Sequence, residues 1–382
     1  MHRVMTAENL WPAIVLPNIA AAYKAQLATL TETKWRRLIG KAQQHSVASL
    51  LYVAVQPFAA DLPADVVELL RAIYRQAVLL SMQRIAELRQ LLDALAVVGI
   101  CPVVFKGAAL AHTLYPSPAC RMMGDIDLWV THAEMPAAIA TLTDLGYQMH
   151  EQERRPHALT QQTDGEVQML AGRPGQGLVE LHWGVFPGEW LAHTTVVDRA
   201  GVRSRLVKGR LVDRPVYLLA PEDALLQLAV HASINHQMTK NVLRCLVDVA
   251  LFSQQPLDWA LVSQRATAWR VATAVGLTLE LTQRIFDLPP LPEVIQRLAP
   301  QGWQRCALEK FVSPQAIVEG QQLSANRRRF FYLLCATDRK RDSLRLVKHT
   351  IWPDAAWLAA RYGRSDWTMR LRHAANSATG NI

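Results

Sequence analysis

The stretch that decides the fold reads Arg121-Met122-Met123-Gly124-Asp125-Ile126-Asp127-Leu128-Trp129-Val130. Its apolar character predicts a buried strand, in which successive side chains point to opposite faces. Asp125 and Asp127 therefore project from the same face. Two neighbouring carboxylates in an apolar strand repel each other and lose solvation, so we expect a positive partner, most simply a divalent metal ion. Removing both charges is then expected to leave the metal-free fold intact or more stable.

A second acidic strand is predicted downstream, in Leu178-Val179-Glu180-Leu181-His182-Trp183. The same alternation puts Glu180 and His182 on one face. Sites that hold two metal ions about 3.5–4 Å apart clamp the attacking and leaving oxygens of a transferred phosphoryl group. Asp125, Asp127 and Glu180 are the three carboxylates that we expect to hold such ions. An acidic pair alone is weak evidence, because acids are common at strand ends and turns.

A turn upstream of these acids, Lys106-Gly107, is placed to bind phosphate. It follows the apolar run 102–105, which predicts a short strand, and precedes residues 108–114, which predict a helix. The first backbone N–H groups of a helix have no partner within the helix and are free to bind an anion.

Several further motifs surround the acidic strand. They comprise Lys106-Gly107, Leu110-Ala111, Tyr115-Pro116, Arg121 and the Glu180-Leu181-His182-Trp183 strand. In this order they resemble the family of uncharacterised bacterial nucleotidyltransferases, within the superfamily that includes DNA polymerase β. Softer matches continue at Pro221-Glu222-Asp223, His231, His236, Arg244, Asp248, Trp352-Pro353 and Arg361-Tyr362-Gly363.

The resemblance implies an α+β fold, with a small mixed sheet and helices of the polymerase β-like nucleotidyltransferase type. It implies an enzyme that moves a nucleoside monophosphate from a nucleoside triphosphate, with ATP the expected one, to an acceptor and releases pyrophosphate. It also implies three groups of site residues: Asp125, Asp127 and Glu180 for Mg²⁺ or Mn²⁺ and catalysis; Lys106, Gly107, Ala108 and Arg121 for the nucleotide; His182 and His231 for contact with substrate.

Two positions depart from the family pattern. Ala108 stands where the superfamily usually has serine or glycine, so a hydroxyl contact to phosphate is missing. Glu180 stands where the family more often has aspartate, and it reaches about one methylene further. Neither change makes the site inert by itself.

Three segments are predicted along the chain. Residues 1–64 form an N-terminal helical segment, 65–200 the nucleotidyltransferase core and 201–382 a mainly helical C-terminal domain. The core begins with a helix over 65–98, ended by Gly99, and is expected to hold four or five strands. No internal repeat or low-complexity segment is present.

Composition limits the class of protein. Of 382 residues, 51% are hydrophobic and 19% are charged, so a large core is expected. The net charge of +9 permits an anionic partner such as a nucleotide or RNA. The five cysteines are scattered, which indicates reduced thiols. With no signal-peptide pattern and no long apolar run, we expect a cytoplasmic protein with no membrane partner.

The acceptor is open: a small molecule, a peptide, a protein or RNA. One alternative is a catalytically silent nucleotide-binding or accessory protein of a biosynthetic cluster. Another is an RNA- or tRNA-modifying nucleotidyltransferase, in which RNA would bind to the basic clusters Arg327-Arg328-Arg329 and Arg339-Lys340-Arg341.

Several further side chains have individual interpretations. Arg121 binds phosphate or pairs with an acid, and His182 contacts substrate or is a hydrogen-bonded core histidine. His231 and His236 are five residues apart and do not share an α-helical face, so a zinc pair is not expected. Arg244 and Asp248, at i and i+4, predict a surface salt bridge.

Overall fold

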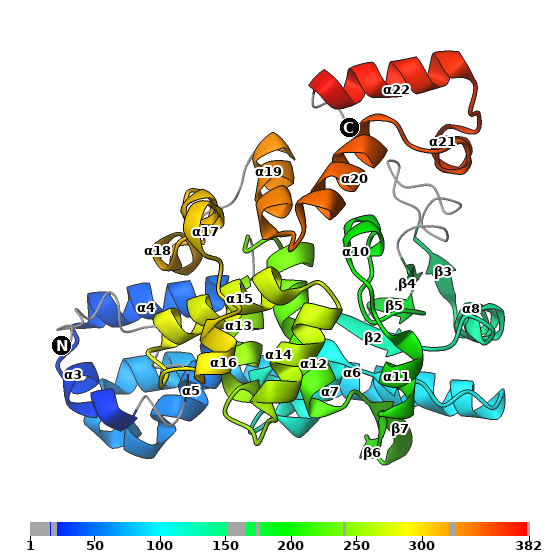
Figure 1. Ribbon diagram of the computed structural model, residues 1–382. Coiled ribbons are helices and arrows are strands. Elements are labelled where there is room, and N and C mark those ends of the chain that lie inside the picture. The colour runs from blue at the N-terminus through cyan, green and yellow to red at the C-terminus, as the bar shows by residue number, and fades with distance from the viewer. Residues whose placement is uncertain are drawn as a thin grey trace.

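The computed structural model describes residues 16, 21–150, 165–172, 176–239, 242–320 and 326–379. These residues form one mixed sheet with helices before and after it in the chain (Figure 1). The predicted α+β fold class is confirmed. Of the predicted N-terminal segment, residues 1–15 and 17–20 lie outside the described part.

The sheet of the described residues has seven strands in the order β3-β4-β5-β2-β1-β7-β6. Their bounds are β1 (Val103–Val104), β2 (Asp125–Trp129), β3 (Tyr147–Met149), β4 (Glu166–Ala171), β5 (Leu178–His182), β6 (Val207–Leu211) and β7 (Arg214–Leu218). The pairs β2–β5 and β1–β7 are parallel, and the other neighbours are antiparallel.

Strands β1 to β5 lie within the predicted core, as expected, and the hairpin of β6 and β7 follows it. Its two turn residues, Val212 and Asp213, have φ values of 48° and 64°. Such turns usually contain Asn-Gly or Asp-Gly, and this sequence carries neither there. The hairpin was therefore missed, and it adds strands after residue 200. The domain boundaries themselves stay a prediction.

Helices before the sheet include the longest one described. They are η1 (Ala21–Tyr23), α3 (Lys24–Ala28), α4 (Glu32–Gln44), α5 (Ala48–Val55), η2 (Gln56–Asp61) and α6 (Ala64–Val97). Helix α6 matches the predicted helix, and Gly99 follows its end with φ 76°, a conformation that glycine adopts without strain.

The remaining helices lie between strands or follow the sheet. They are α7 (Lys106–Thr113), η3 (Pro118–Cys120), α8 (Met135–Asp144), α10 (Glu189–Thr194), α11 (Arg199–Ser204), α12 (Pro221–Val230), η4 (His231–Asn235), α13 (Val242–Phe252), α14 (Trp259–Ala268), α15 (Ala272–Phe286), α16 (Glu293–Gln296), α17 (Gly302–Glu309), α18 (Pro314–Val318), α19 (Asn326–Ala336), α20 (Lys340–Ile351), α21 (Ala355–Tyr362) and α22 (Trp367–Thr379). No described helix combines the length and the apolar character that crossing a membrane requires.

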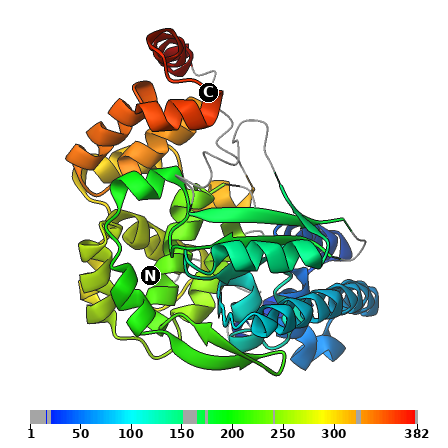
Figure 2. The same ribbon diagram turned by 90° about the vertical axis from the view of Figure 1, so that its right-hand side faces the viewer.

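The two faces of the sheet have different neighbours. Ile126, Leu128 and Leu181 pack in one core with residues of α6 and α8, which lie together on one side of the sheet (Figure 2). Phe105 and Trp129 point the other way, into a core shared with the N-terminal helices and the helices after residue 220. Burying one leucine contributes roughly 1.5–3 kcal/mol, so apolar burial fixes which face of β2 carries the aspartates.

Candidate active site

The register of β2 and β5 brings the predicted acids together. Asp127 lies directly across from Glu180, and Trp129 lies across from His182. Asp125, Asp127, Glu180 and His182 therefore share one face of the sheet, as the alternation predicts. This is the face turned away from α6 and α8.

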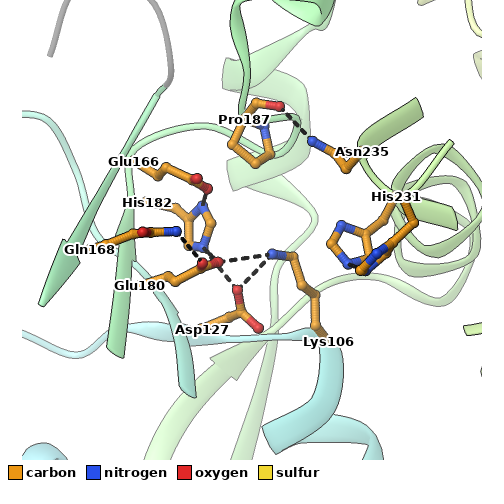
Figure 3. A network of polar contacts seen from close by, with 10 residues as sticks. Lys106, Asp127, Glu166, Gln168, Glu180, His182, Pro187, His231 and Asn235 are labelled. Carbon is orange, nitrogen blue, oxygen red and sulfur yellow. Dashed lines mark hydrogen bonds and ion pairs between the residues drawn. The ribbon is translucent and has the colours of Figure 1, made fainter. Parts of the chain in front are cut away.

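Lys106 is a buried cation beside these acids. Its Nζ donates to Oδ1 of Asp127 at 2.6 Å and lies 3.6 Å from Oε2 of Glu180 (Figure 3). Burial alone would lower the pKa of Lys106, but the charges of Asp127 and Glu180 outweigh burial and raise this pKa above its ordinary value. The ammonium group thus stays charged and neutralises the carboxylates in part, which we had expected a metal ion to do.

The backbone of Lys106 is unusual as well. Its φ of 50° lies in the left-handed region, directly at the start of α7. Residues other than glycine rarely adopt this backbone conformation, and it persists only where the surrounding structure stabilises it. The turn aims the lysine side chain at Asp127 and places Gly107 and Ala108 in the first turn of α7.

His182 is a second buried cation in this cluster. Its Nε2 donates to Oδ1 of Asp127 at 2.9 Å, and its Nδ1 lies 3.3 Å from Oε2 of Glu166. Burial and the charge of Lys106 lower the pKa of His182, but hydrogen bonds to Asp127 and Glu180 raise it to about 9. The imidazole is therefore protonated at neutral pH and lies between Asp127 and Glu166, with a hydrogen bond to Asp127.

Glu166 and Gln168 were missed by the sequence analysis. They lie on β4, where the antiparallel register places Glu166 opposite His182 and Gln168 opposite Glu180. Nε2 of Gln168 donates to Oε1 of Glu180 at 2.9 Å, and burial raises the pKa of Glu166 to about 7. Their spacing of two matches that of Glu180 and His182, but the pairing of β4 with β5 had to be known.

The three predicted metal ligands are not equally placed. Ligand atoms of Asp127, Glu180 and His182 lie within 4.8 Å of one another, and Asp125 is outside this group. Asp125 sits at the start of β2, half-buried, on the same face. Oδ2 of Asp127 is buried and has no hydrogen-bond partner among the described residues. A free carboxylate oxygen suits a hard cation such as Mg²⁺, so these residues fit a divalent metal.

Arg121 forms an ion pair with an acid. Its Nε and Nη2 donate to the two carboxylate oxygens of Asp248 at 2.7 and 2.8 Å, and Tyr115 donates its hydroxyl to the same carboxylate at 2.6 Å. Asp248 is only 1% exposed. Whether Arg121 also binds nucleotide stays a prediction, although its guanidinium lies 3.5 Å from the position of a Cβ at Gly107.

The surface salt bridge predicted between Arg244 and Asp248 is wrong. Asp248 is buried against Arg121, and Nη1 of Arg244 donates to the Met122 carbonyl at 3.2 Å instead. Tertiary packing of α13 on the segment before β2 overrides the local i, i+4 pairing, which contributes only about 0.2–0.5 kcal/mol.

His231 lies beyond Lys106 as seen from Asp127 (Figure 3). Its Nε2 is 3.0 Å from Nε2 of His236, so the expectation that these histidines point apart is wrong. The reason is η4, whose π-helical turn closes with a bond from the His236 N–H to the His231 carbonyl at 2.9 Å. Contact of His231 with a substrate stays a prediction.

A cavity of about 380 Å³ lies beside Lys106. It is lined mainly by apolar side chains of α7, α12 and neighbouring segments, among them Phe105, Leu110, Leu228 and Phe252. Its volume is within the range of small-molecule sites.

The basic clusters on α19 and α20 are exposed, far along the chain from the residues that line the cavity.

One comparison with known proteins gives a match. The model of a family described as uncharacterised nucleotidyltransferase matches residues 31–287, which include every residue of the site above. The later motifs at Trp352-Pro353 and Arg361-Tyr362-Gly363 lie outside the matched range. Neither a curated protein nor a solved structure matches the chain.

Proposed function

The chain belongs to this family of uncharacterised nucleotidyltransferases, and on that premise we propose that it transfers a nucleoside monophosphate from ATP to an acceptor and releases pyrophosphate. The observation that carries the proposal is the pairing of Asp127 with Glu180 across β2 and β5, on a face that also receives Lys106 from the start of α7. Carboxylates and a phosphate-binding helix start are the two parts that metal-assisted phosphoryl transfer needs.

Asp127 and Glu180, with Asp125 beside them, would hold Mg²⁺ or Mn²⁺. A bound divalent ion would neutralise charge on the phosphates and lower the pKa of the acceptor group. The buried Oδ2 of Asp127, which lacks a hydrogen-bond partner among the described residues, supports this assignment. Gln168 supports it too, because its amide orients Glu180 through the hydrogen bond to Oε1.

The start of α7 would bind the β- and γ-phosphates. Backbone N–H groups of Gly107 and Ala108 are in its first turn, where a helix leaves its donors unbonded. Gly107 has no side chain to keep phosphate away, and Ala108 offers only backbone contact. When nucleotide and metal bind, the ammonium group of Lys106 would leave Asp127 and donate a hydrogen bond to a phosphate oxygen instead. The cavity beside Lys106 would take the apolar part of the acceptor.

A catalytically silent nucleotide-binding protein is the second candidate. It is favoured by Lys106 itself, whose ammonium already lies between the two acids and reduces their need for metal. In that case nucleotide would bind with similar affinity with or without divalent ions. In the enzyme, Mg²⁺ and nucleotide would each strengthen binding of the other.

The test is a transfer screen with each of the four α-labelled nucleoside triphosphates, Mg²⁺ or Mn²⁺, and pools of small molecules, peptides and RNA. We expect label to move from one triphosphate onto one acceptor class, with release of pyrophosphate, and only with divalent metal. Nucleotide binding without transfer to any acceptor, and without dependence on metal, would support the silent protein instead. If RNA is the acceptor, the affinity of the protein for RNA should fall steeply as the salt concentration rises.

A further inference from the structure

A second cluster of ligating atoms lies next to the proposed nucleotide site. On a regular α-helix, with 100° per residue, His231 and His236 would point about 140° apart. The π-helical turn of η4 brings them together instead, with ring centroids 4.5 Å apart and planes at 85°. π-helical turns are rare and are frequently found at functional sites.

Cys245 completes the cluster from a different helix, α13. Ligand atoms of His231, His236 and Cys245 all lie within 4.8 Å of one another. Cys245 is 5% exposed. Imidazole nitrogen and thiolate sulfur are both common ligands of Zn²⁺.

The distances agree with a tetrahedral metal site. Two nitrogens bound to one zinc ion lie about 3.3 Å apart, because Zn–N bonds are about 2.0–2.1 Å. The Nε2 atoms of His231 and His236 are 3.0 Å apart. A hydrogen bond between the two Nε2 atoms accounts for this distance as well, and it is the sulfur of Cys245, within 4.8 Å of both histidine ligand atoms, that favours a metal.

We propose that His231, His236 and Cys245 bind Zn²⁺ or a similar borderline-soft transition metal. Two nitrogens and one sulfur select such metals over Mg²⁺, which prefers oxygen. Three protein ligands leave one coordination position of a tetrahedron open, the arrangement found at catalytic rather than structural zinc sites. Figure 3 shows His231 on the far side of Lys106 from Asp127, so the metal would line the same site as the nucleotide without sharing the carboxylates.

The experiment uses Co²⁺ as a coloured substitute for Zn²⁺. Metal-depleted full-length protein is titrated with Co²⁺ alone, and the thiolate-to-cobalt charge-transfer band in the near ultraviolet is recorded. We expect this band to saturate with a single equivalent of Co²⁺ and to disappear when Zn²⁺ is added. The carboxylate cluster around Asp127 contains no sulfur and cannot produce the band.

The variants separate this site from other cysteines and from the carboxylates. Cys245→Ser should remove the band, and His236→Gln should weaken Co²⁺ binding by about 100-fold or more. Cys120→Ser, at another buried cysteine, is the matched control and should keep the band, as should Asp127→Asn. Should Cys245→Ser fail to fold, the result with His236→Gln decides. No charge-transfer band in the native protein, or a band unchanged in both variants, would overturn the proposal while leaving the proposed transfer reaction untouched.

Discussion

Two buried charge clusters lie close together in this protein, and they are built differently. In the first, Arg121 binds both oxygens of Asp248 and Tyr115 donates to the same carboxylate. In the second cluster, Lys106 and His182 both bond Oδ1 of Asp127. The other oxygen of Asp127, Oδ2, is buried and has no hydrogen-bond partner among the described residues. The first cluster is satisfied within the protein, whereas the second has binding capacity left over.

The difference teaches how to tell a structural ion pair from a binding site when both are buried. A bidentate pair with all its oxygens bonded fixes the position of two elements, here the segment before β2 and helix α13. A cluster with an unbonded oxygen and a carboxyl group of raised pKa has the properties that ligand binding uses. Changes in the first cluster should therefore affect stability alone, whereas changes in the second should affect activity as well.

The largest effect is expected on transfer activity from Asp127→Asn. Loss of this charge should reduce turnover by about four orders of magnitude or more, because under the proposed function Asp127 would bind the metal ions and an amide is a much weaker ligand than a carboxylate. The measurement is the transfer assay with labelled nucleotide. Asp144→Asn, at the end of α8, is the control and should retain activity. Near-normal transfer by Asp127→Asn would remove the nucleotidyltransferase assignment.

The same variant revises an expectation about stability. Removal of the aspartate charges was expected to leave the metal-free protein unchanged or more stable. Lys106 and His182, however, both bond Asp127, so its neutralisation leaves buried cations without their main partner. We now expect the melting temperature of metal-free Asp127→Asn to fall below that of the native protein, and a rise would show that repulsion with Asp125 dominates.

The next largest effect is expected in the Arg121 cluster, on stability. Arg121→Ala leaves the buried Asp248 unpaired and should lower the free energy of unfolding by about 3–5 kcal/mol. The double variant Arg121→Met with Asp248→Leu should recover most of this loss, because it removes both buried charges of the pair. Denaturant titration of the three proteins gives the comparison. A loss below about 1 kcal/mol would mean that the pair resembles an exposed salt bridge.

Glu166 should give the second cluster a pH dependence of stability. Its pKa is about 7 in the folded protein and 4.5 is the ordinary value, so the folded protein keeps a proton that the unfolded chain has lost. The stabilisation is fully present below pH 4.5 and is lost as pH rises through 7. In metal-free buffer the change is at most a few kcal/mol, since one pKa unit equals about 1.36 kcal/mol.

Glu166→Gln mimics the protonated carboxyl and should flatten this profile between pH 4.5 and 7. Glu293→Gln, an exposed glutamate on α16, should leave it unchanged. Melting curves across the pH range are the measurement. An unchanged slope in Glu166→Gln would place the titrating group elsewhere.

The smallest effect is expected from Gly107→Ala. A Cβ at this position would meet Arg121 at 3.5 Å, an ordinary contact, so the free energy of unfolding should change by less than about 1 kcal/mol. Any loss should appear in nucleotide affinity, measured by calorimetry, because a methyl group limits approach of phosphate to the backbone. Gly107→Val should weaken binding further. Unaltered affinity in both variants would place the nucleotide away from α7.

The sequence alone identified most of the elements near the site. Apolar periodicity and the glycine after the helix predicted α6, and the alternation within each strand predicted the common face of Asp125 and Asp127 on β2 and of Glu180 and His182 on β5. Both depend on neighbours within a few residues, which a sequence shows directly. The β6–β7 hairpin was missed because its turn residues have positive φ without glycine or asparagine.

Only the tertiary structure decided which charges meet. The pairing of β4 with β5 brought Glu166 and Gln168 to the site. The packing of α13 against the segment before β2 paired Asp248 with Arg121 rather than with Arg244. The π-helical turn of η4 turned two histidines toward each other against their α-helical spacing. A sequence determines local alternation and the chemistry of each side chain. Long-range partners follow from which buried arrangement satisfies the most polar groups, and that depends on the whole fold.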